Sequence, residues 1–417
     1  MPNKINVLHI VAGDLNQGAA RGAYWLHKGL ILNGVNSIIL NNGNFNSEKY
    51  ERVININELF FFSRTINYLR SRLDIYIKKI YRNSRKEIFS TGIFGYNFFH
   101  LKEYKEADVV HLHWINGGLI NLKDLNNIKK PIIWTIRDMW AFTGGCHYSL
   151  DCNRYLTECG NCFFLNSNKE KDLSTYLFNR KKQIITNNSV EIVGISNWIT
   201  NEAKKSNILK DENISTIFNN INTDIFRPYD IIKSKRDLKI VNEKKIILVG
   251  AINANNIWKG FKFLKNALNR LDVEKHQILT FGKINSKDFN QIDLHVTHLG
   301  YIDDDVLLAK IYSLSDVYVT TAIQEAFGKT VVESMACKTP VVCFDNSGPA
   351  DLITHKKEGY LAKIYSSVDL ATGIEWIVNN TNYNEICDNA RKRAKDAFDY
   401  RVISKRYIEL YKKKLKA

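Results

Sequence analysis

The sequence of 417 residues lacks features that would place the chain across or outside a membrane. No stretch resembles a membrane span, and the apolar opening at residues 5–12 is too short and too weakly flanked for a signal peptide. Those residues instead predict a first buried strand. The cysteines number seven, and an odd count argues against a disulfide framework. We therefore expect a cytoplasmic protein.

The sequence also lacks internal repeats, low-complexity tracts and any nucleic-acid-binding motif, which disfavours a nucleic-acid-binding protein. Its formal net charge of +16 would suit anionic lipid, nucleic acid or a phosphorylated substrate. However, the chain is rich in Asn, Ile and Lys and has only 5 prolines, a bias that can spread lysine over a surface without any function. Both explanations of the charge remain open.

The length suits two domains of about 200 residues each. Strand-like runs alternate with helical patterns throughout, which is typical of stacked βαβ units and predicts an α/β protein. Each half supplies its own parallel sheet. The predicted strands are 5–11, 36–40, 109–113, 132–135 and 191–195, then 245–249, 277–281, 295–298, 317–320 and 340–344. A polar stretch at 219–236 contains Pro228, and we expect domains at 1–228 and 229–397.

The most informative segment runs from 325 to 337 and joins an apolar strand to a helix of small residues. Glu325 and Glu333 bracket it, so both should lie near the carboxyl end of a parallel strand, where ligands bind in open α/β sheets. Gly328 would let the backbone approach a ligand, and the amides of Lys329 and Thr330 would open a helix that favours phosphate. On spacing alone, two solvated glutamates are an equal alternative.

The surroundings of the two glutamates carry a wider resemblance. Residues 312–319 precede the pair, and Lys338-Thr339-Pro340, Ser347-Gly348-Pro349 and Glu358-Gly359 follow it at matching positions. With residues 218–228 and the stretch 249–260, this pattern resembles the retaining GT-B glycosyltransferases known as family 4, over most of the chain. The resemblance implies a GT-B fold, with two Rossmann-like, doubly wound parallel-sheet domains facing a central cleft. It also implies that a last helix, at about 398–417, returns to the first domain.

The resemblance assigns roles to the donor side. Glu325 would hold donor-sugar hydroxyls, Glu333 the nucleotide ribose, and Lys259 the donor diphosphate. A glycine-rich loop around Gly18 would also contact the donor, although Gln17 replaces the family's first glycine, which leaves the exact contact in doubt. An ordinary strand-to-helix turn is the alternative there. The implied donor-binding set is Gly18, Gly250, Lys259, Ala326, Phe327, Gly328, Lys329, Thr330 and Glu333.

Arg137 ends a predicted strand where many family members have histidine. Arginine cannot serve as a base, but it clamps phosphate or carboxylate in a bidentate fork, so we expect an electrostatic role. A structural Arg137–Asp138 pair is the alternative. His111 and His113 should point to one face of a strand and, with Asp138, are acceptor-side candidates rather than metal ligands.

Four cysteines lie in one short polar loop: Cys146, Cys152, Cys159 and Cys162. Their number suits a closed tetrahedral zinc site, although the first spacing is longer than in common zinc ribbons. This block resembles a subgroup of bacterial polysaccharide glycosyltransferases that includes colanic-acid-type enzymes. A structural zinc and free or paired thiols remain equal alternatives, and no cofactor is expected for catalysis.

Residues 60–86 interleave basic and apolar residues at helical spacing, which predicts a basic amphipathic helix. Such a helix can lie at an anionic membrane surface, and the chain would then be peripheral at the inner face of the cell membrane. In the alternative, its apolar face packs on the first domain while its charges are solvated.

Together these features predict a retaining, metal-independent, hexosyltransferase-type enzyme. It would move a sugar from a nucleotide-diphosphate sugar to a saccharide acceptor, which could be lipid-linked, in bacterial surface polysaccharide biosynthesis. Glu325, Arg137 and Lys259 are the expected catalytic residues. Two alternatives remain: a GT-B-fold nucleotide-sugar epimerase, and a non-enzymatic basic protein that binds membrane or nucleic acid.

Overall fold

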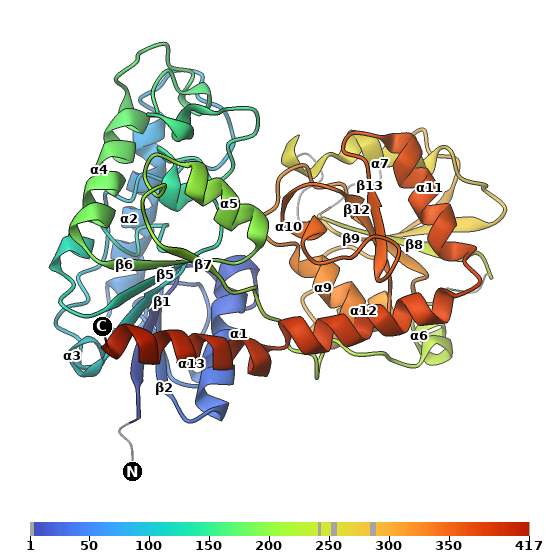
Figure 1. Cartoon of the computed structure of the whole chain (residues 1–417), viewed down its shortest axis with the longest axis horizontal. Coiled ribbons are helices and arrows are strands. Elements are labelled where there is room, and N and C mark those ends of the chain that lie inside the picture. Colours follow the sequence, from blue (N-terminus) through green and yellow to red (C-terminus); the bar gives the residue numbers. More distant parts are fainter. Residues whose placement is uncertain (1–3, 241–242, 252–256, 284–288, 417) are drawn as a thin grey trace. The chain divides into compact units, whose positions relative to one another are not determined.

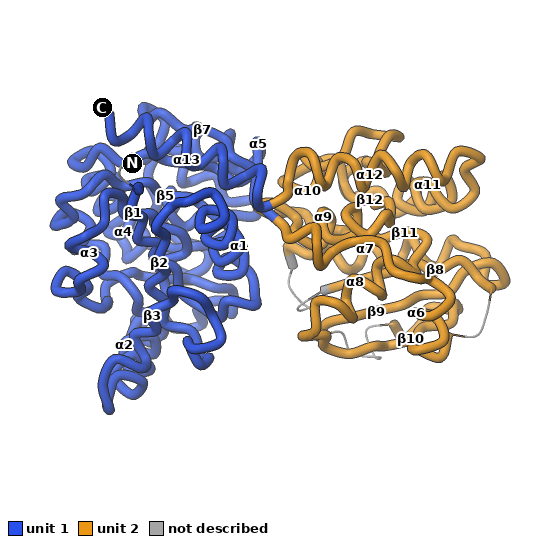
Figure 2. Tube along the Cα trace, turned by 90° about the horizontal axis from the view of Figure 1, so that it is seen from below, with its two compact units in different colours: residues 1–220, 400–417 blue, residues 221–399 orange. Residues whose placement is uncertain are grey.

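The computed structural model describes residues 4–240, 243–251, 257–283 and 289–416. The chain forms two compact units: unit 1 is residues 1–220 with 400–417, and unit 2 is residues 221–399 (Figure 2). The division therefore lies at 220, whereas the sequence places it at 228. The division falls earlier because Ile221 already contacts the end of unit 2. Its N–H donates to the carbonyl of Phe398 at 2.9 Å.

Unit 1 contains a seven-stranded parallel sheet in the order β3-β2-β1-β4-β5-β6-β7. The order reverses between β1 and β4, so this pair marks the point where a ligand site is expected in such a sheet. Its strands are β1 (Asn6–Ile10), β2 (Asn36–Asn41), β3 (Val53–Asn55), β4 (Val109–Leu112), β5 (Ile132–Ile136), β6 (Val190–Gly194) and β7 (Ile214–Thr216).

The helices of unit 1 include one from the far end of the chain, as the sequence predicts. They are α1 (Gly18–Leu32), α2 (Ser63–Lys78), α3 (Lys102–Glu106), α4 (Leu173–Asn187), α5 (Asn197–Lys205) and α13 (Tyr400–Lys416). α13 packs against α1, which it crosses in Figure 1, and a Cβ at Gly29 would lie 2.6 Å from the carbonyl oxygen of Tyr400. Only glycine permits this approach, which brings Ile403 and Tyr407 into one core with Leu26.

Unit 2 contains a six-stranded parallel sheet in the order β10-β9-β8-β11-β12-β13, which reverses between β8 and β11. Its strands are β8 (Lys245–Ala251), β9 (His276–Gly282), β10 (His295–His298), β11 (Val317–Val319), β12 (Val341–Phe344) and β13 (Gly359–Ala362). Its helices are α6 (Ile231–Asp237), α7 (Phe261–Leu268), α8 (Asp305–Leu314), α9 (Lys329–Ala336), α10 (Ser347–Ala350), α11 (Ser367–Val378) and α12 (Tyr383–Phe398). Both units thus confirm the predicted parallel α/β architecture.

Candidate functional site

The reversal point of the unit 2 sheet carries an ion pair. Lys259 ends the short turn Ile257–Lys259 after β8, and Glu325 lies in the loop between β11 and α9. The Nζ of Lys259 is 2.5 Å from Oε2 of Glu325, and both side chains are about a quarter exposed, at 26% and 25%. The structure therefore brings together the predicted diphosphate-binding cation and the predicted sugar-binding carboxylate.

The two loops that carry this ion pair are fastened to each other. The N–H of Ile323 donates to the carbonyl of Trp258 at 2.6 Å, and the hydroxyl of Thr321 donates to the carbonyl of Lys259 at 2.9 Å. Gly260 has a φ of +61°, and a Cβ there would lie 2.2 Å from the carbonyl oxygen of Thr321. The ion pair is thus held by backbone geometry. Residues 252–256 of the predicted phosphate-contacting turn lie outside the described residues.

The turn into α9 has the form predicted for an anion-binding helix start. Gly328 precedes the helix with a φ of +92°, a conformation that favours glycine, and no side chain caps the helix there. The N–H of Gly348 donates to the carbonyl of Glu325 at 2.8 Å, and a Cβ on Gly348 would lie 2.5 Å from the carbonyl oxygen of Ala326. Close packing of these two turns therefore fixes the backbone on both sides of Phe327.

Glu333 lies deeper than its predicted contact with ribose suggests. It is only 2% exposed, and its Oε2 accepts a hydrogen bond from the hydroxyl of Tyr312 at 3.2 Å. Burial, followed by the nearby Glu333 carboxylate, raises the pKa of Tyr312 well above its usual range, so this phenol stays a donor. The structure gives Glu333 a partner inside unit 2, and its role at the ribose stays a prediction.

Two buried polar atoms beside Glu325 have no hydrogen-bond partner in the described part of the chain. They are Oδ1 of Asn346, the residue before α10, and Oγ of Ser347, the first residue of that helix. Ser347 also has a φ of +48°, which is strained for a residue with a side chain. The Nδ2 of Asn346 donates to the carbonyl of Ile323, so the start of α10 contacts the Glu325 loop directly. Unsatisfied buried polar atoms are costly, which makes both residues candidates for ligand contacts.

In unit 1, the predicted glycine-rich loop follows β1 at the reversal point of that sheet. Gly13 and Gly18 have φ values of +94° and +44°, and a Cβ on either would meet no atom within 4 Å. The N–H of Gly13 donates to Oδ1 of Asn42 at 3.2 Å. The loop borders a pocket of about 810 Å³ within unit 1, whose lining also includes Gln17 and Trp114. The loop is therefore open to a ligand.

Arg137 follows β5 as predicted, but its guanidinium is buried and its hydrogen-bond partners are neutral. Its Nη1 donates to Oδ1 of Asn219 at 2.9 Å, while Nε and Nη2 lie 3.4 and 3.3 Å from Nδ1 of His113. A Cβ on Gly22 would come within 2.6 Å of Nη1, so glycine makes room for the cation. Burial lowers the pKa of Arg137 to about 10, which still leaves it charged at neutral pH.

Asp138 does not pair with Arg137 among the ion pairs of the described residues. Its Oδ2 instead accepts hydrogen bonds from Nε1 of Trp114 at 2.9 Å and Nδ1 of His147 at 2.6 Å. Its Oδ1 accepts from the N–H of Trp140 at 2.9 Å. The alternative of a structural Arg137–Asp138 pair is thus wrong, and Asp138 organises the loop that follows β5.

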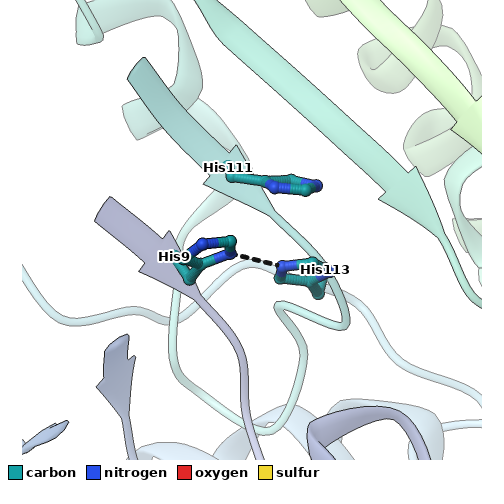
Figure 3. A group of neighbouring side chains, drawn as sticks. All are labelled: His9, His111 and His113. Atoms are coloured by element: carbon teal, nitrogen blue, oxygen red, sulfur yellow. Dashed lines mark hydrogen bonds between the residues drawn. The ribbon is translucent and has the colours of Figure 1, made fainter. Parts of the chain in front are cut away.

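Three histidines form a buried cluster (Figure 3), and one of them, His113, contacts Arg137. His9 from β1 and His111 from β4 are partners in register, and His113 follows β4. Arg137 can only donate, so Nδ1 of His113 accepts and its Nε2 carries the proton toward Nδ1 of His9, 2.9 Å away. Burial holds the pKa values of all three well below the usual range, so the rings are neutral.

This histidine cluster resembles a metal site only in its compactness. Its ligand atoms all lie within 4.8 Å of one another. However, Nδ1 of His111 is 2.7 Å from the hydroxyl of Tyr411, and its Nε2 is 2.8 Å from that of Thr135, so both ring nitrogens are engaged in hydrogen bonds. The Arg137 guanidinium would also repel a metal cation. We therefore interpret the cluster as a hydrogen-bonded support for Arg137.

The four clustered cysteines are free thiols, and Cys146, Cys159 and Cys162 are buried. Burial raises the pKa values of Cys146, Cys159 and Cys162, which favours the neutral thiols in the absence of a metal ion. Among the described residues, however, the group with ligand atoms within 4.8 Å is the histidine cluster, so zinc at the cysteines stays a prediction.

Several residues of the site were not predicted from the sequence. His9 has a signal that could have revealed it, since a histidine in the first strand borders the reversal point of the sheet. Asn219 has no such signal, because it lies 82 positions from its partner Arg137. The same holds for Tyr407, whose hydroxyl is 2.8 Å from Oγ1 of Thr135 and which is brought there by α13.

Comparison with known proteins gives this geometry a family context. Residues 230–396, most of unit 2, match the family model described as Glycosyl transferases group 1. The chain is homologous to glycosyltransferases. An uncharacterized glycosyltransferase of Methanocaldococcus jannaschii is 26% identical over 322 residues, which cover 73% of this chain and 75% of the relative.

Two further comparisons extend this context. The N,N'-diacetylbacillosaminyl-diphospho-undecaprenol alpha-1,3-N-acetylgalactosaminyltransferase of Campylobacter jejuni is 26% identical over 218 residues, or 50% of this chain and 56% of the relative. The crystal structure of a glycosyltransferase from Rickettsia africae covers 99% of both chains with a TM-score of 0.68 and 19% identity. Structural similarity of this kind identifies the GT-B fold.

Proposed function

We propose that the chain is a retaining glycosyltransferase that moves a glycosyl group from a nucleotide-diphosphate sugar to a hydroxyl of a saccharide. The observation that carries this proposal is the Lys259–Glu325 ion pair at the reversal point of the unit 2 sheet, within the segment that matches the glycosyltransferase family. A donor diphosphate would compete with Glu325 for Lys259. The carboxylate released in this way can then accept hydrogen bonds from the sugar hydroxyls.

In the proposed reaction, the bond between the anomeric carbon and the diphosphate oxygen breaks, and the acceptor oxygen forms a new bond on the same face. The acceptor hydroxyl's proton passes to the departing diphosphate oxygen, so no side chain has to be a nucleophile. Lys259 and the amides after Gly328 would stabilise the negative charge on the leaving group, and the protein would mainly position substrates. This step uses no metal ion.

Other residues would complete the donor site of unit 2. The unpartnered side-chain atoms of Asn346 and Ser347 lie at the start of α10 against the Glu325 loop and would meet hydroxyls of the donor. We assign Glu333 to the ribose, as the family resemblance implies. In unit 1, Arg137 would hold an anionic group of a substrate, with Asn219 and His113 fixing its fork.

We further propose that the acceptor is a saccharide of bacterial surface polysaccharide biosynthesis, carried on a lipid diphosphate. The relative from Campylobacter jejuni supports this choice, because its name describes transfer to a diphospho-undecaprenol-linked sugar. The donor base would be found by thermal-shift measurements with nucleoside diphosphates and their sugars.

The decisive test is the Glu325→Gln variant in a transfer assay with the donor identified by that screen. We expect kcat to fall by about 10²- to 10³-fold, since a group that acts on the reacting sugar loses its charge. Glu274→Gln, a change at a solvated glutamate of unit 2, serves as the matched control. Near-normal turnover of Glu325→Gln would refute the assignment. A new nucleotide sugar formed without acceptor would identify an epimerase instead, and NMR of the product's anomeric proton reports retention.

A further inference from the structure

Helix α2 of unit 1 buries polar side chains and exposes apolar ones, which is the opposite of an ordinary surface helix. Its buried residues are polar or charged: Ser63, Asn67, Asp74 and Lys78. These positions are spaced by four, seven and four residues, so they lie along one face of the helix. The sequence left open that the apolar face of this helix packs on unit 1. The structure contradicts this alternative for most of that face, because Leu69 and Leu73 are exposed, whereas Ile66 and Ile77 are half-buried.

The buried polar face is fixed in place by specific hydrogen bonds. The N–H of Phe60 donates to Oγ of Ser63 at 3.0 Å, and Nδ2 of Asn67 donates to Oδ1 of Asn57 at 3.0 Å. Asp74 accepts from the N–H of Gly92 at 3.0 Å, and Nζ of Lys78 donates to the carbonyl of Glu87 at 2.6 Å. Rolling the helix to bury its apolar side would break all of these bonds.

The outward side of this segment is strongly apolar. Phe61 is 93% exposed and Ile80 is 79% exposed, which are large values for such side chains. The same stretch of chain exposes several more large apolar or aromatic residues: Leu59, Phe60, Phe62, Tyr68, Leu69, Leu73, Ile75 and Tyr76. So many large exposed apolar side chains within one short segment indicate an interaction site, since single exposed apolar residues are what an ordinary surface shows.

Cations lie among these apolar residues. The Nζ of Lys79 is 4.3 Å from the ring centre of Tyr76, and the guanidinium of Arg72 is 5.0 Å from that of Tyr68. Arg64 and Arg82 are also exposed on this segment, within a chain of net charge +16. Apolar side chains with interspersed Lys and Arg suit the boundary between acyl chains and anionic headgroups.

We propose that residues 59–82, the docking face, bind the surface of an anionic lipid bilayer. Helix α2 would lie in the headgroup region, with Phe61 and Ile80 entering the acyl layer and Arg72 and Lys79 contacting lipid phosphates. Tyr68 and Tyr76 suit the interface, where one end of the ring is apolar and the other is wet. No helix in the described residues is long and apolar enough to cross a membrane.

The test is flotation of the full chain with vesicles of phosphatidylglycerol and phosphatidylcholine in equal parts, compared with pure phosphatidylcholine. We expect binding to the anionic vesicles that weakens as salt is added. The double variant Arg72→Gln/Lys79→Gln should bind roughly thirtyfold more weakly, because each basic residue near such a surface contributes appreciably. Phe61→Ser/Ile80→Ser should weaken binding by at least about tenfold.

Matched controls change the same residue types elsewhere. Lys412→Gln/Lys413→Gln alters exposed lysines of α13, and Ile232→Ser alters an exposed apolar residue of α6, so both should bind vesicles as the natural chain does. Equal binding by the docking-face variants and the controls would overturn the proposal. So would the absence of vesicle binding, or a protein dimer in sedimentation that Phe61→Ser/Ile80→Ser abolishes while vesicle binding persists.

The membrane-docking proposal and the proposed transferase activity can be refuted independently of each other. Transfer to a soluble saccharide acceptor should be unchanged in the docking-face variants, because no residue of the donor or acceptor machinery is altered. Near-ultraviolet circular dichroism checks that each variant is folded. A variant that is folded and active on the soluble acceptor but still binds vesicles fully would contradict the docking proposal and leave the proposed activity intact.

Discussion

The two units hold their key cations in opposite ways. In unit 2, Lys259 is a quarter exposed and pairs with a carboxylate, Glu325. In unit 1, Arg137 is buried and is bound by an amide oxygen and an imidazole nitrogen, both neutral. A partly exposed ion pair between loops contributes little to stability, because solvent screens it. A buried guanidinium with neutral partners depends on each hydrogen bond that it makes.

The two sites therefore differ in how they would bind an anionic ligand. Arg137 retains a full positive charge without a neutralising carboxylate, so an anionic ligand would supply what the unit lacks. Lys259 already has an anion, which a ligand must displace. An anion that binds in unit 1 would gain the attraction of Arg137 without displacing a carboxylate. An anion that binds in unit 2 would have to replace Glu325 as the partner of Lys259. Substitutions should separate the two cases, since stability and transfer respond differently.

The largest effect is expected from removing the two cations, one at a time. Arg137→Met and Lys259→Met should each lower kcat/KM for transfer by about 10²- to 10³-fold. Arg137→Met should also lower the free energy of unfolding by about 1–3 kcal/mol, since buried acceptors on His113 and Asn219 lose their donor. Lys259→Met should change that free energy by less than about 1 kcal/mol.

Urea unfolding followed by circular dichroism measures the stability half of this comparison. Arg137→Lys is the informative control, because it keeps the charge but loses the planar fork, and it should restore little of the transfer. Equal stability losses for Arg137→Met and Lys259→Met would contradict the distinction between the two units.

A second prediction concerns pH and applies to unit 1. Burial lowers the pKa of His27 to about 4 and holds those of His9, His111 and His113 well below the usual range. Their stabilising effect is complete above the unfolded pKa of about 6.5. As the pH falls below this unfolded pKa, the histidines of the unfolded chain bind protons, whereas the same histidines remain neutral in the folded chain. The free energy of unfolding should then fall by about 1.4 kcal/mol per pH unit for each histidine.

The matched variants for this pH dependence are His27→Gln and His295→Gln. His27 is buried and bonds the hydroxyl of Ser37 at 2.8 Å, whereas His295 is an exposed residue of unit 2. Removing His27 should reduce the pH dependence of the free energy of unfolding by about 1.4 kcal/mol per pH unit, or one proton, between about pH 6.5 and pH 4. Urea unfolding at a series of pH values measures both slopes, and identical slopes would refute the assignment.

The fold was largely predictable because its signals are local. Buried parallel strands such as 109–113 and 317–320 are short apolar runs between helices, and the structure has strands at both places. The edge strands β3, β7 and β13 were missed, since each is short and none forms an apolar run as long as those of the central strands. Helix α2 was predicted from its periodicity, but periodicity does not say which face is buried. Hydrogen-bond partners far along the chain, such as Gly92, decide that.

The site was predictable only where residues follow one another in sequence. Glu325 and Gly328 lie in one turn, and Lys259 is the residue expected to share their ligand. Their direct ion pair, however, depends on how the loops after β8 and β11 pack, which spacing does not reveal. The support of Arg137 by Asn219 is equally non-local. Burial is the other missing quantity, as the position of Glu333 shows.

The smallest effect on transfer is expected from changes in the cysteine loop of unit 1. Lys181 in unit 1 is buried, and its Nζ donates to the carbonyl of Trp140 at 2.5 Å near Cys146 and Cys159. Four thiolates around one zinc ion carry two net negative charges, which a buried ammonium would offset.

We therefore expect one zinc per chain by elemental analysis. Cys159→Ser/Cys162→Ser should lose it while soluble-acceptor transfer changes less than about tenfold. Cys343→Ser, a buried cysteine of unit 2, should retain it, and metal-free natural protein with four reactive thiols in this loop would contradict the zinc site.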